Sequence, residues 1–475
     1  RLNVHCHDIF TVFGKRSRLQ SMRTVDVNKA LFIPVSEQTL EEVGILITRG
    51  SKALIRLRQF VYGVDCEDYV IHEALVISIL SGEIILEISS KTLTLVKTLT
   101  SPVAVDICFR FVNTFHCMHS AIDRVNLDLL FYQPLLKLVR EKNRNLVQES
   151  YSLLSPTQAA ALSRIIHSSP GPPVLLLGPF GTGKTQTVAE AIKVLVSQQK
   201  ERCRILICTH SNSAADHYIE DYLQKIFKDM NKESSSDEKL LRLYWEHRLA
   251  ASISDTMLPY CIMNLNTGTF RDPTLDELAR KTVIVTTLVT ADMLVKCGVK
   301  PGFFTHIFID EAAQAMEVET LIPLSLATED TKVVLAGDHL QLSPPVFSSI
   351  GRKLLLDKSL LVRLYESYPA SSSRKILLLE NFRSYPEIVN IPSKLFYEGS
   401  LVSRKQLPND LQYPVKFYGV HGLEEKAKDS PSYVNMAEVA EITERIEEMV
   451  NRWPKQHFGE LQLEKTCVLS AHYAQ

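Results

Sequence analysis

The chain has 475 residues, of which 45% are apolar and 23% are charged, and its formal net charge is −1. This composition is that of a soluble globular protein with several domains, and it excludes a largely disordered chain. A net charge near zero does not by itself indicate a nucleic-acid partner, so binding of nucleic acid would require a local basic surface.

The cysteine content, the hydropathy and the two ends of the sequence bear on the cellular location of the protein. Nine cysteines occur without a CxxC pair, which favours reduced thiols and predicts a cytoplasmic protein, with the nucleus as a second location. His5, Cys6 and His7 lack a second ligand pair at zinc-finger spacing, so we interpret them as ordinary side chains. No apolar run is long enough to predict a membrane span. The start lacks the layout of a signal peptide, and we expect the chain to be a fragment of a longer polypeptide.

The first part of the chain is rich in β-branched runs separated by turn residues. We predict a β-rich, barrel-like domain over 1–118, and we interpret its small basic–aromatic patches, 15–18 and 55–60, as solvated strand faces more readily than as RNA contacts. Helical spacing with mixed charge over 119–154 predicts a helical stalk.

From residue 155 onwards, short apolar runs alternate with helical or irregular sequence, which is typical of buried parallel strands in an α/β sheet. We predict one such domain over 155–345, with a mostly helical insertion at about 225–280, and a second over 346–475. The boundary is placed at the Pro344–Pro345 pair. The second domain is expected to contain strands at 376–380, 415–420 and 466–471 and a long helix across 437–453.

The segment VLLLGPFGTGKTQT, residues 174–187, contains G-x-x-x-x-G-K-T between a predicted strand and a predicted helix. The backbone N–H groups of such a loop surround phosphate oxygens, its lysine reaches the β- and γ-phosphates, and its Ser or Thr ligates Mg²⁺. ATP and Mg²⁺ are therefore the predicted cofactors, and a GTPase is disfavoured because no Asn-Lys-x-Asp stretch is present. The predicted contacts are Gly178, Pro179, Gly181, Thr182, Gly183, Lys184, Thr185 and Gln186, with Gln158 upstream on the adenine edge.

The segment IFIDEAAQAME, residues 307–317, ends a predicted strand in two acids. Asp310 is placed to hold Mg²⁺ together with Thr185, and Glu311 to act as general base on the attacking water. The two roles need separate carboxylates, because a metal-bound oxygen is a poor base. Gln314 would direct its amide at the γ-phosphate or the water.

Two later segments supply further nucleotide contacts. In KVVLAGDHLQLSPPV, residues 332–346, Gln341 follows another strand and can contact the γ-phosphate. In ILLLENFRSYPEIVN, residues 376–390, Arg383 is a candidate arginine finger and Phe382 can stack on the base. In isolation, Arg383 would more readily be interpreted as a surface ion-pair residue.

Polar residues also end the strands at 204–216 and 283–291. Ser211, Asn212, Thr286 and Thr287 suit hydrogen bonds to a sugar–phosphate backbone. The same residue types cap helices, and the sequence leaves both interpretations open.

These motifs, in this order, resemble the Upf-like group of superfamily 1 helicases. ICTHSNSAAD, ENFRSYPEIVN and LFYEGSL are more similar still to the helicase-with-zinc-finger proteins, which are relatives of the Moloney-leukaemia-virus-ten-type RNA helicases. The resemblance runs from about residue 150 to the end. It implies two RecA-like P-loop domains that clamp ATP, single-stranded RNA across their top, and movement from 5′ to 3′. It also implies partners in RNA decay or ribonucleoprotein particles.

Carried over residue by residue, the resemblance implies a catalytic set of Glu311, Lys184, Arg383, Gln314 and Gln341. It places Gln158 and Phe382 at the adenine-contacting positions, and Phe382 stands where relatives have a tyrosine. The implied RNA contacts are Ser211, Asn212, Thr286, Thr287, Pro345 and Val346. The family's zinc finger and its second arginine finger do not occur before Gln475.

Two alternatives remain open. A DNA helicase of the same group would use the same phosphate and sugar contacts, since only a contact to the 2′-hydroxyl distinguishes RNA from DNA. An ATP-gated RNA-binding clamp that recruits partners would also keep these motifs, although Glu311 and Arg383 argue against an inactive enzyme.

Overall fold

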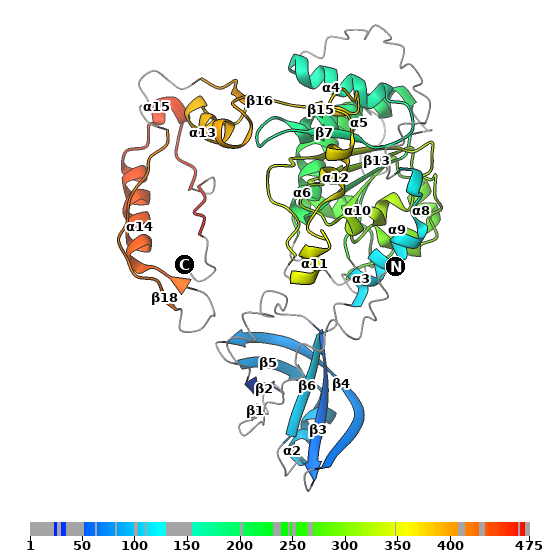
Figure 1. Cartoon of the computed structure of the whole chain (residues 1–475), viewed down its shortest axis with the longest axis vertical. Helices are drawn as coiled ribbons and strands as arrows, with labels where there is room; N and C mark the ends of the chain where they lie inside the picture. The colour runs from blue at the N-terminus through cyan, green and yellow to red at the C-terminus, as the bar shows by residue number, and fades with distance from the viewer. Residues whose placement is uncertain are drawn as a thin grey trace. The chain divides into compact units, whose positions relative to one another are not determined.

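The computed structural model describes most of the chain, and it forms two compact units, residues 1–112 with 417–475 and residues 113–416. Each part is described by itself (Figure 1). The described residues are 23–25, 30–34, 52–61, 64–80, 83–98, 103–109, 112–129, 154–199, 203–230, 239–245, 248, 253–264, 269–346, 348–406, 414–426, 433–463 and 466–470.

The N-terminal part is an antiparallel sheet of six strands, in the order β1-β2-β5-β4-β3-β6. Buried residues alternate along it, as at His72, Ala74 and Val76, so one face is covered. The predicted β-rich domain is confirmed, with an unpredicted helix, α2 (Ser90–Thr98). Residues 15–18 lie outside the described residues. The strands are β1 (Arg23–Val25), β2 (Ala30–Pro34), β3 (Lys52–Val61), β4 (Val64–Leu80), β5 (Glu83–Ile88) and β6 (Val103–Phe109).

The second unit is built on a parallel sheet of seven strands in the order β15-β7-β14-β13-β8-β12-β9. The central strands are buried along nearly their whole length, which explains why they are continuous apolar runs. The α/β prediction is confirmed. The strands are β7 (Val174–Leu177), β8 (Ile205–Thr209), β9 (Leu240–Arg242), β12 (Val283–Thr287), β13 (His306–Asp310), β14 (Lys332–Gly337) and β15 (Lys375–Leu377).

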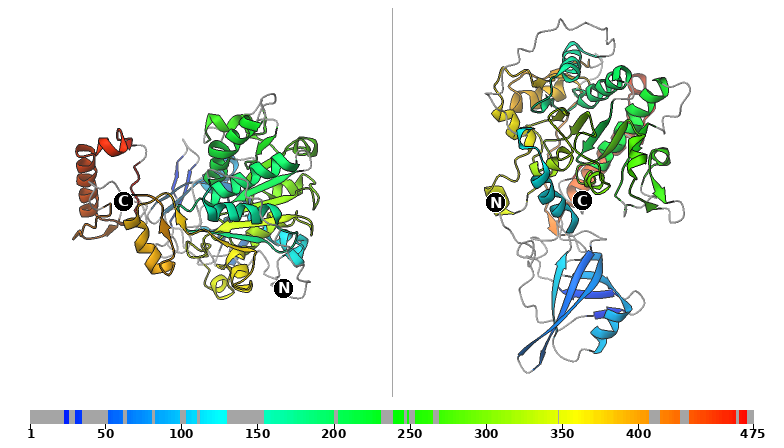
Figure 2. Two further views of the ribbon diagram at one scale, coloured as in Figure 1. Left: turned by 90° about the horizontal axis from the view of Figure 1, so that it is seen from above. Right: turned by 90° about the vertical axis from the view of Figure 1, so that its right-hand side faces the viewer.

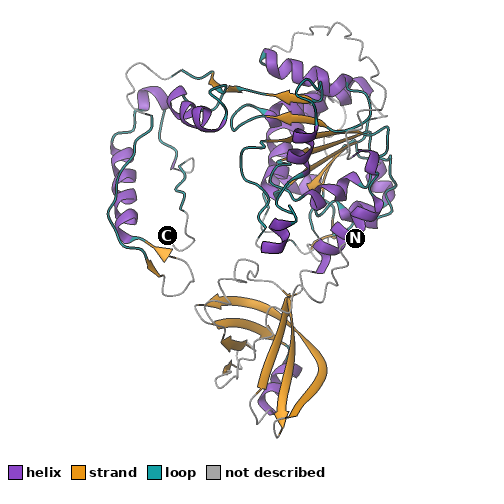
Figure 3. Cartoon of the chain, in the orientation of Figure 1, coloured by secondary structure: helices purple, strands orange, loops and turns teal. Residues whose placement is uncertain are grey.

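Helices cover both faces of this sheet (Figures 2 and 3). Alternate strand residues enter two separate apolar cores: Leu176 packs in one and Leu175 in the other. One core receives α4 (Pro156–His167), α5 (Lys184–Gln199), α6 (Asn212–His217) and the π-helical turn η4 (Tyr218–Leu223). The other core receives α3 (Val112–Arg124), α9 (Asp292–Lys296), α10 (Glu317–Leu324) and α12 (Leu360–Ser367).

Two short strands correct the predicted organisation. The insertion predicted at about 225–280 also contributes a strand to the main sheet, because β9 pairs with β12 as a buried edge strand. The strand predicted at 376–380 for the second domain is β15, which pairs with β7 in the same sheet. The sheet therefore continues beyond the boundary predicted at 345. The three residues of β9 carry too little periodicity to be separated from a loop by sequence.

Beyond β15 the described residues include two longer helices, α13 (Pro386–Phe396) and α14 (Met436–Asn451), and two-residue strand pairs, joined by loops. Asn435 caps α14 through its side chain, and the predicted long helix is confirmed. Strands predicted at 415–420 and 466–471 are wrong within the described residues, since Phe417 and Leu469 are each 87% exposed. Among all the described helices, none is long and apolar enough to cross a bilayer.

Candidate active site

The glycine-rich loop between β7 and α5 is shaped by two glycines with left-handed backbone angles. Gly181 has φ of 69° and Gly183 has φ of 77°. A Cβ at Gly183 would stand 2.4 Å from Nε2 of Gln158. The loop lies at the carboxyl end of the sheet, where open α/β sheets bind their ligands, and α5 begins at Lys184 with its N–H groups facing the loop.

Gly183→Ala is expected to weaken ATP binding about tenfold, because a left-handed conformation costs an L-residue roughly 1–2 kcal/mol and the new methyl must displace Gln158. The measurement is titration with a fluorescent ATP analogue. Gly399→Ala is the matched control, because Gly399 has φ of 74° and nothing within 4 Å of an added Cβ. Equal ATP affinity in the two variants would contradict the assignment of this loop.

Thr185 and Asp310 meet as a pair of oxygen ligands. Oγ1 of Thr185 donates to Oδ2 of Asp310 at 3.1 Å, and Asp310 ends β13 at 4% exposure. A hydroxyl and a carboxylate at this spacing fit a divalent cation that takes its other ligands from phosphate and water. Within the described ranges no group of three or more His, Cys, Asp or Glu could hold a metal. Residues 5–7 lie outside those ranges.

Lys184 and Glu311 line the same cavity, and the pKa of each side chain is shifted from its ordinary value. Nζ of Lys184 donates to the backbone carbonyl oxygens of Gly178 and Pro179, and burial lowers its pKa. Burial, followed by the charge of Asp310, raises the pKa of Glu311, which brings a carboxylate closer to the range of a general base. Glu311 also has φ of 56°, a strained conformation of the kind found at functional sites.

One cavity collects these groups. Its volume is about 410 Å³. Gln341 donates from Nε2 to Oδ2 of Asp338 at 2.6 Å, and the hydroxyl of Tyr397 donates to the same oxygen at 2.6 Å. The predicted residues that line the cavity are Lys184, Thr185, Ser211, Asp310, Glu311, Gln314, Gln341 and Arg383.

Comparison with known proteins assigns this arrangement to a family. A family described as "AAA domain" matches residues 154–268 and 271–349, and a second with the same description matches 356–475. "Probable helicase with zinc finger domain" of Mus musculus is 42% identical over 343 residues, 71% of this chain and 17% of that protein. "RNA helicase Mov10l1" of Mus musculus is 33% identical over 319 residues, 61% of this chain and 25% of that protein.

This chain belongs to the Upf-like group of superfamily 1 helicases. It spans less than a fifth of the length of the mouse zinc-finger relative. Among solved structures, "The structure of PRRSV helicase" has a TM-score of 0.28 at 13% identity, covering 78% of this chain and 54% of that one.

The two residues predicted to contact adenine have different environments in the structure. Gln158 is 3% exposed. Its Oε1 accepts from the backbone N–H of Ser155 at 2.9 Å, and its Nε2 donates to the carbonyl of Thr182 at 3.2 Å. The amide is therefore occupied in capping α4 and bracing the glycine-rich loop. Phe382 is 44% exposed, and its backbone N–H donates to the carbonyl of Gly181 at 2.9 Å, so its ring is free to stack on a base.

The residues predicted to contact RNA fall into two groups. Thr286 is fully buried, and its hydroxyl donates to the carbonyl of Leu243 at 3.2 Å, so burial removes it from any RNA contact. Ser211 caps α6 through the N–H of Ala214, and the hydroxyl of Thr287 donates to that of Thr290 at 2.8 Å. The residues that retain exposed or half-buried surface are Ser211, Asn212, Thr287, Pro345 and Val346.

Tyr218 and Asn381 lie at the candidate site and were not predicted from the sequence. Tyr218 begins η4, and its hydroxyl donates to Oδ2 of Asp310 at 2.6 Å. Burial and the charge of Asp310 raise the pKa of Tyr218, so the phenol stays protonated. Asn381, fully buried, donates to the carbonyl of Phe180 at 2.6 Å and accepts from the backbone N–H of Arg383 at 3.0 Å. The segment ENFR contained the signal for Asn381, whereas nothing local marks Tyr218.

Proposed function

We propose that this chain hydrolyses ATP in response to single-stranded RNA and uses the cycle to move along it from 5′ to 3′. The observation that carries the proposal is the single cavity lined by Lys184, Thr185, Asp310, Glu311 and Arg383. These residues come from the glycine-rich loop, the end of β13 and the segment after β15, and together they match the requirements of phosphoryl transfer.

Each group has a defined task in this proposal. Lys184 leaves its backbone partners, the carbonyls of Gly178 and Pro179, to neutralise charge on the β- and γ-phosphates. Thr185 and Asp310 hold Mg²⁺, which supplies charge neutralisation on the phosphates when bound. Glu311 accepts a proton from the attacking water, and Gln314 orients that water.

One observation supports RNA as the polymer, and a second supports nucleic-acid binding in general. A relative that matches 61% of this chain is named "RNA helicase Mov10l1". The exposed polar surface at Ser211, Asn212 and Thr287 stands at the carboxyl ends of β8 and β12, and such groups position a sugar–phosphate backbone without reading bases. A DNA helicase of the same group would use the same contacts, so the two are separated by experiment.

The test is steady-state ATP hydrolysis by the 475-residue chain with single-stranded RNA and with DNA of matched sequence. We expect RNA to stimulate hydrolysis more than DNA does. Equal stimulation would favour a general nucleic-acid helicase, and binding of RNA and ATP without hydrolysis would favour an ATP-gated clamp. Displacement of duplexes carrying a 5′ or a 3′ single-stranded tail then tests the direction, with the 5′-tailed duplex expected to open.

A further inference from the structure

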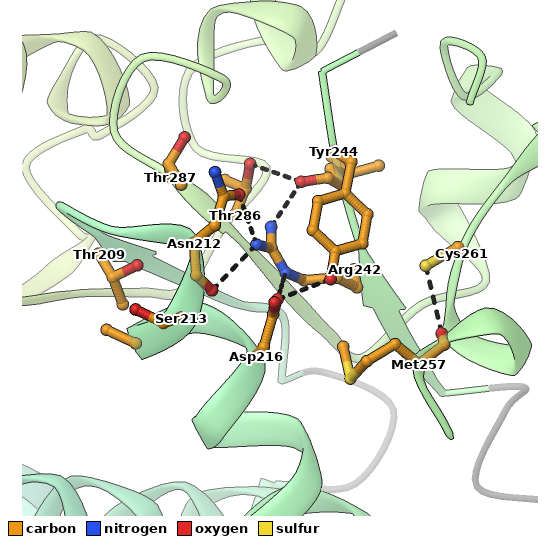
Figure 4. A network of polar contacts seen from close by, with 12 residues as sticks. Thr209, Asn212, Ser213, Asp216, Arg242, Tyr244, Met257, Cys261, Thr286 and Thr287 are labelled. Carbon is orange, nitrogen blue, oxygen red and sulfur yellow. Dashed lines mark hydrogen bonds and ion pairs between the residues drawn. The ribbon is translucent and has the colours of Figure 1, made fainter. Parts of the chain in front are cut away.

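Arg242 is a charged residue that the structure buries completely near the site. It ends β9, and its side chain has 0% exposure. The guanidinium lies under the ring of Tyr244, 4.0 Å from the ring centroid (Figure 4). A buried cation is costly unless every donor finds a partner, so its partners indicate what it holds in place.

Two nitrogens of the Arg242 guanidinium donate to residues of α6, and the third donates to the backbone next to Arg242. Nε donates to Oδ1 of Asp216 at 2.7 Å, and Nη2 donates to Oδ1 of Asn212 at 2.8 Å. Nη1 donates to the carbonyl of Leu243 at 2.7 Å. The hydroxyl of Tyr244 donates to the same Oδ1 of Asp216 at 2.7 Å. Asn212 begins α6 and Asp216 lies within it, so the fork fixes the first turn of that helix (Figure 4).

The same turn faces the reacting groups on its other side. Ser211 caps α6, and its hydroxyl donates to Oε2 of Glu311 at 3.4 Å. The carbonyl of Ser211 accepts from the hydroxyl of Thr209, the last residue of β8, at 2.6 Å. The side chain of Asn212 remains exposed. The turn at residues 211–213 therefore contacts Glu311, accepts a hydrogen bond from Arg242 and exposes the side chain of Asn212.

The three hydrogen bonds of Arg242 require a planar guanidinium group. Three acceptors on Asp216, Asn212 and Leu243 are reached by three different nitrogens of one guanidinium. A lysine ammonium keeps the charge but is a single point and cannot occupy the three positions together. Replacing Arg242 by lysine should therefore retain a cation near Asp216 while releasing the turn.

We propose that Arg242 is a positioning residue for ATP hydrolysis, which holds the turn at residues 211–213 from behind so that Ser211 stays against Glu311. This rests on the proposed function, in which Glu311 activates the water. The exposed side of the turn at residues 211–213 is the surface proposed for RNA. A phosphodiester bound there would move the turn and so change the position of Ser211 relative to Glu311. The buried fork makes the turn rigid enough to transmit that contact.

The experiment compares Arg242→Lys with the wild-type chain in steady-state hydrolysis, with and without single-stranded RNA. We expect kcat to fall roughly tenfold to a hundredfold, as small displacements of a reacting group produce, while KM for ATP is unchanged because the glycine-rich loop is untouched. Arg271→Lys is the matched control. Arg271 makes a two-pronged ion pair with Glu277 within residues 225–280, and its replacement should leave kcat unchanged.

A second variant makes the test independent of the first. Asp216→Asn keeps the shape of the acceptor and removes its charge, so it should lower kcat in the same direction at unchanged KM, including where Arg242→Lys fails to fold. In the double variant the two losses should overlap rather than multiply, because both act through one contact. A merely structural role would instead lower the melting temperature and the active fraction without separating kcat from KM.

The outcomes distinguish this inference from the function on which it rests. If the wild-type chain hydrolyses ATP and folded Arg242→Lys and Asp216→Asn keep its kcat, the positioning role is wrong. If the wild type hydrolyses ATP without responding to RNA, the RNA function is wrong, and the positioning role still requires a lowered basal kcat in both variants. If the wild type does not hydrolyse ATP at all, both are overturned.

Discussion

Glu311→Gln is expected to lower steady-state ATP hydrolysis by between about a hundredfold and ten-thousandfold, the range that a general base contributes. The amide has the shape of the carboxylate but cannot accept the proton of the attacking water. Asp310, Thr185 and Lys184 remain in place, and ATP binding should therefore persist. The raised pKa of Glu311, caused by burial and by Asp310, fits a group that exchanges a proton during turnover.

The measurement pairs phosphate release with direct titration of a fluorescent ATP analogue. Glu317→Gln is the control, because it makes the same chemical change six positions along the chain, at a residue whose carboxylate pairs with Arg363 at 2.7 Å. Full activity in Glu311→Gln would remove the general-base assignment. Loss of binding together with activity would show that the residue holds the site together rather than acting on water.

Arg383→Ala should have a comparable or larger effect, with hydrolysis reduced by about a thousandfold or more if the side chain acts as an arginine finger. The structure places this residue against the glycine-rich loop. Its Cβ is 2.8 Å from the position that a Cβ on Gly181 would occupy, and buried Asn381 fixes its backbone. Arg383 also lines the cavity that contains Lys184 and Asp310, which is where an arginine finger would have to stand.

Presteady-state hydrolysis at saturating ATP is the appropriate readout, since it isolates the chemical step from nucleotide affinity. Arg404→Ala is the matched control: Arg404 is an exposed arginine whose Nε donates to Oε1 of Glu380 at 2.7 Å, and its loss should cost little, as for most surface pairs. A loss in Arg383→Ala confined to KM would assign the side chain to ground-state binding.

Much of the site was predictable because its chemistry lies in contiguous segments. The glycine-rich loop and the pair Asp310 and Glu311 each follow a buried strand, and parallel strands bring their carboxyl ends to one edge. This is why residues over a hundred positions apart, such as Thr185 and Asp310, come within 3.1 Å. The position of the sheet was also predictable, because its central strands are buried and are therefore continuous apolar runs.

The remainder depended on contacts that no local pattern encodes. Gln158 and Thr286 have side chains suited to ligands, but the fold uses both internally. Tyr218 reaches Asp310 because a π-helical turn places it there. The short edge strands β9 and β15 form because neighbouring strands offer them partners. In each case the role of the residue or strand depends on tertiary contacts, which the local sequence does not predict.

The backbone at Glu311 has an evolutionary consequence. Its φ of 56° is a conformation that costs a residue other than glycine about 1–3 kcal/mol. Selection for folding alone would favour relieving that cost, while selection for turnover retains the acid. Lineages in which ATP hydrolysis is no longer selected should therefore replace Glu311 by glycine and gain stability. Laboratory selection for stability alone should favour the same substitution and yield folded chains without ATP hydrolysis.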